Sequence, residues 1–158
     1  RFHCSGPDTS ALEALTANGL DVRYIGPTIG QASGLKMVYA ASTKGTYALW
    51  TELLTAAHSM GLDDALEAEL SLGDTSIADR MIAGIPDTPR RARRWVGEME
   101  EIALTFKTLG LTPKILEGAA EMFTLEGNTP LGGLTSRDPL PNLKDMLDVL
   151  ASQAKRES

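Results

Sequence analysis

Lys36 is the residue of this 158-residue chain best placed to do chemistry. It lies about a turn and a half into a stretch, residues 31–60, whose pattern predicts one long and largely apolar helix. Burial and the positive partial charge of the helix N-terminus would both lower the pKa of its ammonium. A lysine that loses its proton near neutral pH can accept one from a substrate hydroxyl, and its charged form can polarise a carbonyl. The alternative is a structural lysine that reaches solvent or pairs with a carboxylate.

The neighbours of Lys36 on this predicted helix are small or carry hydroxyl groups. At about 100° per residue, the following residues share its stripe or border it: Ser33, Tyr39, Ala40, Thr43 and Tyr47. Such a surface can hold a small polar substrate beside the lysine. The alternative is close helix-helix packing through small residues. Because the helix is apolar almost all round, we expect it to lie at the centre of a domain.

The elements that position these residues divide into two predicted parts. Residues 1–28 suggest a strand at 2–4, a helix at 10–18 ended by Gly19, and a strand at 22–25. This unit is too small to fold alone, so we interpret it as the C-terminal remnant of a nucleotide-binding α/β domain whose remainder is missing. Residues 29–158 are predicted to form a helical domain, which makes the fold class mainly α.

Capping residues and apolar spacing predict the later helices. They are expected at about residues 63–72, 74–83 (starting at Asp74), 89–109 (capped by Thr88), 113–125 and 142–154, with a loop at 126–141. In the third of these, apolar residues recur at spacings of 3 and 4 from Ala92 to Leu109, which predicts a packing seam within or between chains. Four cations crowd its first turns: Arg90, Arg91, Arg93 and Arg94. Either an anionic ligand or acids such as Glu98 could neutralise them.

Composition excludes several classes of function. Acidic residues outnumber basic ones by 21 to 15, so nucleic acid is not an expected partner. Cys4 is the only cysteine, which rules out an intramolecular disulfide and fits a reducing, cytoplasmic compartment. His3 and His58 lack ligand spacing, so no metal is predicted. Charges interrupt every window long enough to span a bilayer, so no membrane span is predicted.

The glycines before the long helix do not form a nucleotide motif. Gly26, Gly30 and Gly34 follow a predicted strand, but they match neither G-x-G-x-x-G nor a phosphate-binding loop. The chain therefore has no dinucleotide motif of its own, and we expect it to be inactive in isolation.

A family resemblance rests first on the predicted strand followed by Gly26-Pro27 and Gly30-x-Ala32-x-x-x-Lys36. It rests also on three segments: residues 35–45 (LKMVYAASTKG), 90–103 (RRARRWVGEMEEIA) and 118–121 (GAAE). The chain resembles the C-terminal helical domain of the 6-phosphogluconate dehydrogenase and β-hydroxyacid dehydrogenase superfamily, in its bacterial phosphogluconate dehydrogenase C-terminal-domain branch. This resemblance covers about residues 2–125. It implies a multi-helix domain built on one long central helix and preceded by a short remnant of a Rossmann domain.

The resemblance also implies roles for individual residues. Lys36 matches the catalytic acid-base lysine; Gly30, Ser33, Tyr39, Ala40 and Thr43 match the substrate site, and Gly30 with Gln31 borders the cofactor. NAD or NADP would be bound mainly by the other domain, and the chain would form a homodimer that acts on a hydroxy acid or a similar small polar alcohol. Two positions depart from the pattern: Ala32 replaces a glycine, and Ala40 replaces an asparagine that helps bind substrate. Tyr39 or Thr43 would supply the missing hydrogen bond. The alternative is a non-catalytic dimerisation or ligand-sensing module that keeps the scaffold.

Overall fold

The computed structural model describes residues 1–73 and 75–157. The chain forms two compact units, residues 1–40 and 41–158. This division falls inside the stretch predicted as one helix, whereas the domain boundary at residue 28 stays a prediction. The fold is mainly helical with a small parallel sheet near the N-terminus, which confirms the predicted fold class.

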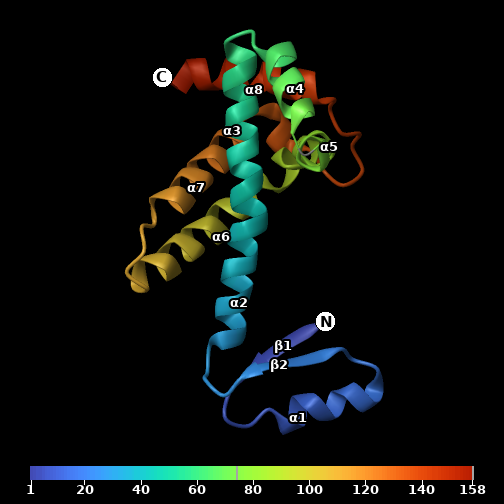
Figure 1. Ribbon diagram of the computed structural model, residues 1–158, viewed down its shortest axis with the longest axis vertical. Coiled ribbons are helices and arrows are strands. Elements are labelled where there is room, and N and C mark those ends of the chain that lie inside the picture. The colour runs from blue at the N-terminus through green and yellow to red at the C-terminus, as the bar shows by residue number, and fades with distance from the viewer. Residues whose placement is uncertain (74, 158) are drawn as a thin grey trace. The chain divides into compact units, whose positions relative to one another are not determined.

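The first unit begins with the predicted strand-helix-strand arrangement (Figure 1). Strand β1 (Phe2–Ser5) pairs in parallel with β2 (Val22–Gly26). The crossover consists of α1 (Ser10–Glu13) and a 3₁₀ turn, Ala14–Asn18. Gly19 ends this turn with φ of 83°, a left-handed conformation that glycine adopts without steric strain.

The stretch predicted as one helix is divided by a turn of π-helix. Helix α2 (Gln31–Ala40) leads into the π-helical turn Ala41–Gly45, and α3 (Thr46–Ser59) follows. Helix α2 contains no buried residue, whereas α3 buries five. The expected central position therefore holds for α3 and is wrong for α2.

The described part of the second unit contains five more α-helices. They are α4 (Asp63–Leu72), α5 (Thr75–Gly84), α6 (Pro89–Thr108), α7 (Lys114–Gly127) and α8 (Leu143–Glu157). These bounds agree with the predicted helices to within three residues, although Asp74 lies outside the described residues. The predicted loop at 126–141 is partly wrong, because α7 includes Glu126 and Gly127 and a 3₁₀ turn covers Pro130–Gly133.

Helices α6 and α7 run side by side and form the densest contact of the second unit (Figure 1). The predicted seam on α6 is buried from Ala92 through Trp95 and Met99 to Ile102, whereas Leu109 is exposed. The seam therefore packs within the chain over most of its length. No helix among residues 1–73 and 75–157 is long and apolar enough to cross a membrane.

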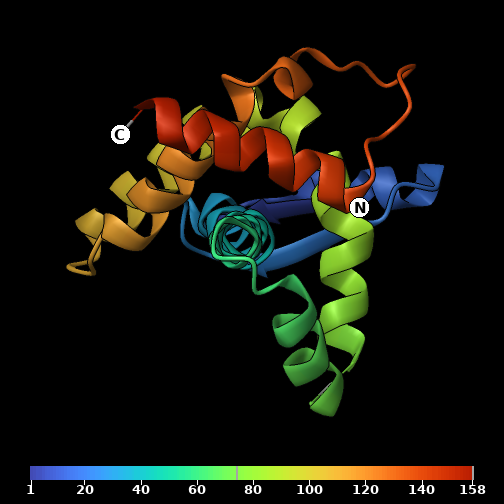
Figure 2. The same cartoon turned by 90° about the horizontal axis from the view of Figure 1, so that it is seen from above.

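Three aromatic rings from three helices form one layer of this core. The ring of Trp95 on α6 stacks on Tyr47 of α3, with centroids 6.4 Å apart, and meets the edge of Phe123 of α7 at 5.1 Å. Helices α4 and α5 form a hairpin beside α3, and α8 packs against α3 and α7 (Figure 2).

Candidate functional site

The turn that precedes α2 is built around the side chain of Gln31. Its Oε1 accepts a hydrogen bond of 3.0 Å from the backbone N–H of Thr28, which resembles a capping box. A Cβ at Gly26 would lie 2.4 Å from this oxygen, so only glycine fits there without displacing the side chain. The side-chain oxygen Oε1 of Gln31, a predicted cofactor-binding residue, is therefore already used by the fold.

The first turn of α2 is also tied to the sheet. The hydroxyl of Ser5, at the end of β1, accepts a hydrogen bond of 3.0 Å from the N–H of Ala32. Gly30 has φ of 94°, which disfavours any side chain, although a Cβ there would meet no atom within 4 Å. The start of the lysine helix is thus fixed by hydrogen bonds, and the space beside Gly30 is open.

Lys36 is exposed, and its predicted burial is wrong. The described contacts of α2 are mainly with β1 and β2, at the end of the helix that precedes the lysine. No side chain of α2 is buried, so the helix does not enclose Lys36 in an apolar core. An exposed ammonium is accessible to a substrate without any rearrangement of this unit.

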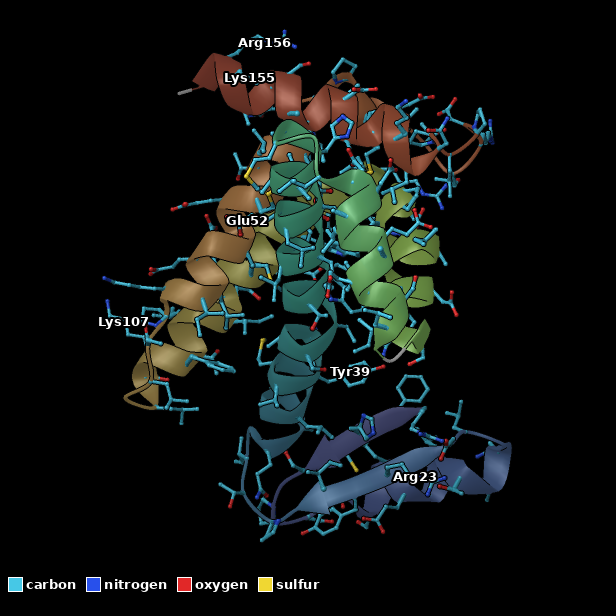
Figure 3. All side chains as sticks on the ribbon, turned by 45° about the horizontal axis from the view of Figure 1, so that its top comes forward. Arg23, Tyr39, Glu52, Lys107, Lys155 and Arg156 are labelled. Atoms are coloured by element: carbon cyan, nitrogen blue, oxygen red, sulfur yellow. The ribbon has the colours of Figure 1, made fainter. Side chains whose placement is uncertain are left out.

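Most of the predicted substrate residues lie on α2 with the lysine. Ser33 and Tyr39 are three residues from Lys36 and Ala40 is four, so all three neighbour it on the helix surface. Tyr39 is 68% exposed and projects outward (Figure 3). Thr43 lies in the π-helical turn, which belongs to the other unit. The uniform 100° spacing that predicted one stripe does not hold through that turn.

The four arginines at the start of α6 have partners within the fold. Arg90 and Arg91 both pair with Asp87, the latter at 2.5 Å. Arg94 lies 3.6 Å from Glu98, and Arg93 donates to the carbonyl of Gly127 at 3.0 Å. The acid pairs predicted as the alternative to an anionic ligand are therefore present.

A second lysine lies in the π-helical turn. Lys44 pairs with Glu98, and its Nζ lies 5.8 Å from the centroid of the Trp95 ring. Its side chain is only 19% exposed, so this lysine is held by the core of the second unit. It links the π-helical turn to α6 and is a structural group.

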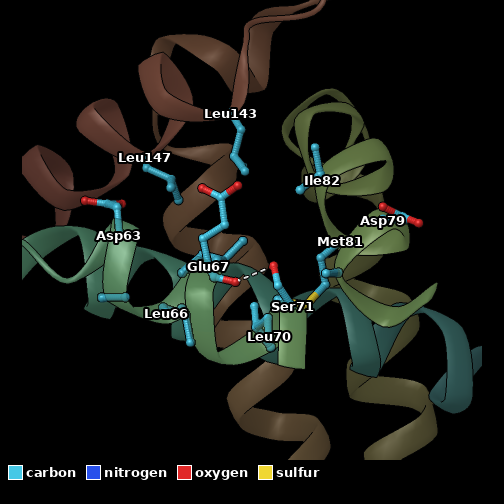
Figure 4. A pocket seen from close by; sticks show the side chains of 13 residues that line it. Asp63, Leu66, Glu67, Leu70, Ser71, Asp79, Met81, Ile82, Leu143 and Leu147 are labelled. Carbon is cyan, nitrogen blue, oxygen red and sulfur yellow. Dashed lines mark hydrogen bonds between the residues drawn. The ribbon is translucent and has the colours of Figure 1, made fainter. Parts of the chain in front are cut away.

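A cavity with a volume of about 310 Å³ lies between α3, α4, α5 and α8 (Figure 4). Its wall is mostly apolar, with Leu70, Met81 and Leu147 among the lining residues. The four polar residues that line it are all exposed: Asp63, Glu67, Ser71 and Asp79. The lining therefore presents no buried polar group that would select a ligand.

Two titratable residues acquire structural roles that the sequence does not predict. Glu126 is 0% exposed, and His58 contacts carboxylates on two other helices. The helical spacing from Ala119 through Phe123 to Glu126 is the signal that could have placed this carboxyl on a buried stripe. Within the described residues, no group of three or more His, Cys, Asp or Glu side chains could hold a metal ion.

Residues 57–125 match the family described as Domain of unknown function (DUF1932). Over 121 residues the chain is 28% identical to an uncharacterized 28.5 kDa protein in the 7S RNA 5′ region of Methanothermus fervidus, covering 76% of this chain and 48% of that protein.

Two solved structures share the fold. A conserved hypothetical protein from Sinorhizobium meliloti 1021 matches with a TM-score of 0.74 and 28% identity. The match covers 96% of this chain and 51% of that protein. The second is conserved protein MTH1747 of unknown function, which is described as structurally similar to 3-hydroxyacid dehydrogenases. It matches with a TM-score of 0.62 and 29% identity, and the match covers 84% of this chain and 52% of that protein. The chain thus spans about half the length of these relatives. Residues 57–125 are thus similar to the DUF1932 family, and the chain shares its fold with a protein described as structurally similar to 3-hydroxyacid dehydrogenases.

Proposed function

We propose that this chain is the substrate-binding, lysine-bearing and dimerisation domain of an NAD(P)-dependent oxidoreductase that acts on a hydroxy acid or a similar small polar alcohol. Lys36 is the acid-base residue, and Gly30, Ser33, Tyr39, Ala40 and Thr43 contribute the substrate site. The observation that carries the proposal is an accessible lysine on a helix with hydroxyl-bearing neighbours, in a fold shared with a protein similar to 3-hydroxyacid dehydrogenases.

The lysine would exchange a proton with the substrate. Its neutral amine accepts the hydroxyl proton as the alcohol becomes a carbonyl, while the hydride of the alcohol carbon would pass to NAD(P)⁺. In the reverse direction its ammonium returns a proton. Ser33 and Tyr39 can each donate or accept a hydrogen bond beside it, which would orient the hydroxyl. Tyr39 or Thr43 would replace the contact that Ala40 cannot make.

The described residues fit only the edge of a dinucleotide site. The open space beside Gly30 allows a close approach, but the side-chain oxygen Oε1 of Gln31 already accepts a hydrogen bond from Thr28. We therefore assign the cofactor mainly to a separate nucleotide-binding domain, in line with relatives about twice the length of this chain. The isolated chain is expected to have no measurable affinity for NAD or NADP.

The test is Lys36→Ala in a protein that joins this chain to its nucleotide-binding domain, assayed with small hydroxy acids and either nicotinamide cofactor. Turnover should fall by about 10²- to 10⁴-fold, the usual contribution of a general acid-base group, while cofactor binding measured by fluorescence is unchanged. Lys107→Ala, at an exposed lysine of α6, is the matched control and should leave turnover unaltered (Figure 3). Retained turnover in Lys36→Ala would refute the catalytic role. Absence of turnover in the unsubstituted protein would favour the non-catalytic module.

Exposed apolar side chains at one end of the second unit support the dimerisation role. Leu109 and Leu111 flank the turn between α6 and α7, and Leu104 and Ile115 lie on the adjoining helix ends. Their exposed fractions run from 55% to 74%. Exposed apolar clusters of this kind commonly mark protein-protein contacts.

A further inference from the structure

Glu126 is a buried carboxyl at the meeting point of three helices. It lies in the last turn of α7 and is 0% exposed. Thr88, which precedes α6, and Thr51 of α3 lie beside its carboxyl and are themselves buried. This polar layer adjoins the aromatic layer, because Thr51 follows Tyr47 by one turn and Glu126 follows Phe123 by one turn.

If Glu126 were ionised, the contacts of its carboxylate with Thr88 and of Thr88 with Ile85 would have one hydrogen too few. The hydroxyl oxygen of Thr88 lies 2.6 Å from Oε2 of Glu126 and 2.9 Å from the carbonyl oxygen of Ile85. A threonine hydroxyl has a single hydrogen and cannot donate to both oxygens. If Glu126 carries a proton, its O–H donates to Thr88, whose own O–H donates to Ile85. Both contacts are then satisfied.

The other neighbours do not supply the missing donor. The hydroxyl of Thr51 makes its 2.9 Å hydrogen bond to the carbonyl of Tyr47, and that of Thr129 bonds the backbone carbonyl of Glu126 at 2.7 Å. Oε1 of Glu126 has no hydrogen-bond partner among the described residues. A buried carboxylate left in this state is far more costly than a neutral acid.

We propose that Glu126 is a pH-sensitive latch of the second unit. As a neutral acid it completes the chain of hydrogen bonds through Thr88 to Ile85, and as a carboxylate it breaks this chain and loosens the packing of α3, α6 and α7. Burial raises the pKa of Glu126 to about 7. The latch therefore changes state near neutral pH.

Among the described side chains of the neighbouring elements, no charged group offsets this burial. Before α6, Asp87 pairs with Arg90 and Arg91; on α6, Arg93 bonds the carbonyl of Gly127. On the other two neighbouring helices, Glu52 of α3 is exposed, and Asp148 of α8 pairs with His58. The following charged residues of α8 are also exposed: Lys144, Asp145, Lys155 and Arg156. None of these residues contributes to the pKa shift of Glu126, so its own ionisation controls the latch.

Equilibrium unfolding of the chain in urea between pH 5 and pH 8.5 tests the latch. The reference is Glu126→Gln, whose amide can donate to Thr88 at every pH. Relative to this variant, the unfolding constant of the unsubstituted chain should rise about tenfold per pH unit from pH 5 to pH 7. Over the whole pH range the rise should be about two orders of magnitude. Glu121→Gln, at an exposed position of the same helix, should keep the original pH dependence. Identical profiles for the unsubstituted chain and Glu126→Gln would overturn the proposal.

A direct titration keeps the proposal testable if Glu126→Gln does not fold. The side-chain carboxyl carbon of Glu126, followed by NMR in the unsubstituted chain, should titrate with a midpoint near neutral pH. A midpoint near that of an ordinary glutamate would also overturn the proposal. Both measurements use the chain without substrate or cofactor, so their outcome is independent of the proposed catalytic function.

Discussion

At the scale of single residues, His58 connects three helices through its two ring nitrogens. From the last turn of α3, Nδ1 lies 3.0 Å from Asp63 of α4 and Nε2 lies 2.9 Å from Asp148 of α8. Hydrogen bonds from Asp148 and then Asp63 raise the pKa of His58 above its ordinary value of 6.5. This stabilisation is fully present below pH 6.5 and is lost as the pH rises through the folded-state pKa.

Replacing His58 by glutamine should therefore destabilise the chain more at acidic than at alkaline pH. We expect the free energy of unfolding to fall by about 1 kcal/mol at pH 5.5, and by less at pH 8.5, because exposed ion pairs contribute modestly. Thermal melts at the two pH values measure the difference. An equal loss at both would show that the imidazolium contributes nothing beyond packing.

Residue positions on helices were predictable, and residue environments were not. The location of Lys36 in the second turn of its helix follows from local signals such as Gly30 and the apolar run after it. Its exposure depends on which elements cover α2, and no local pattern encodes that. The spacing of Ala119, Phe123 and Glu126 could indicate burial, but the hydrogen-bond partner of Glu126, Thr88, lies 38 residues earlier in the chain and no local pattern predicts it.

At the scale of elements, the 3₁₀ turn Pro130–Gly133 packs against the end of α7. A Cβ at Gly132 would lie 2.4 Å from the carbonyl oxygen of Gly127, a backbone atom with little freedom to move. A Cβ at Gly133 would meet nothing within 4 Å. Two adjacent glycines thus differ completely in their tolerance of a side chain.

We expect Gly132→Ala to lower the free energy of unfolding by about 1–3 kcal/mol, the usual range for forced overpacking. Gly133→Ala, the matched control, should change it by no more than about 0.5 kcal/mol. Urea denaturation of both variants measures the difference. Similar values for the two would mean that the turn moves to accept the methyl group.

Helix boundaries in the second unit were predictable because caps and breakers act locally. The cap predicted at Thr88 is the exception, since this residue has helical dihedrals and its side chain makes no capping bond. The 3₁₀ turn Ile85–Asp87 leads directly into α6, so the hydroxyl is directed toward Ile85 and Glu126 instead. A tertiary contact has replaced the local one.

At the scale of the whole molecule, we expect the interface of the proposed homodimer to include the exposed apolar residues near the turn between α6 and α7. Ile115 is 74% exposed, so Ile115→Glu should leave the fold intact and shift a dimer toward monomer at micromolar concentration. Light scattering after size exclusion measures the mass, and circular dichroism checks the fold. A monomeric unsubstituted chain would contradict the dimerisation role. An unchanged dimer would place the interface elsewhere.

The π-helical turn at residues 41–45 has a consequence for comparing sequences. Closing a hydrogen bond from residue i to i+5 takes one residue more than closing an α-helical turn. A relative whose helix is α-helical throughout can therefore match both flanks of this segment with one residue fewer. An alignment that forbids a gap here would shift every position on one side by one. Motif spacings counted from Lys36 toward Tyr47 are thus comparable only between chains that share the extra residue.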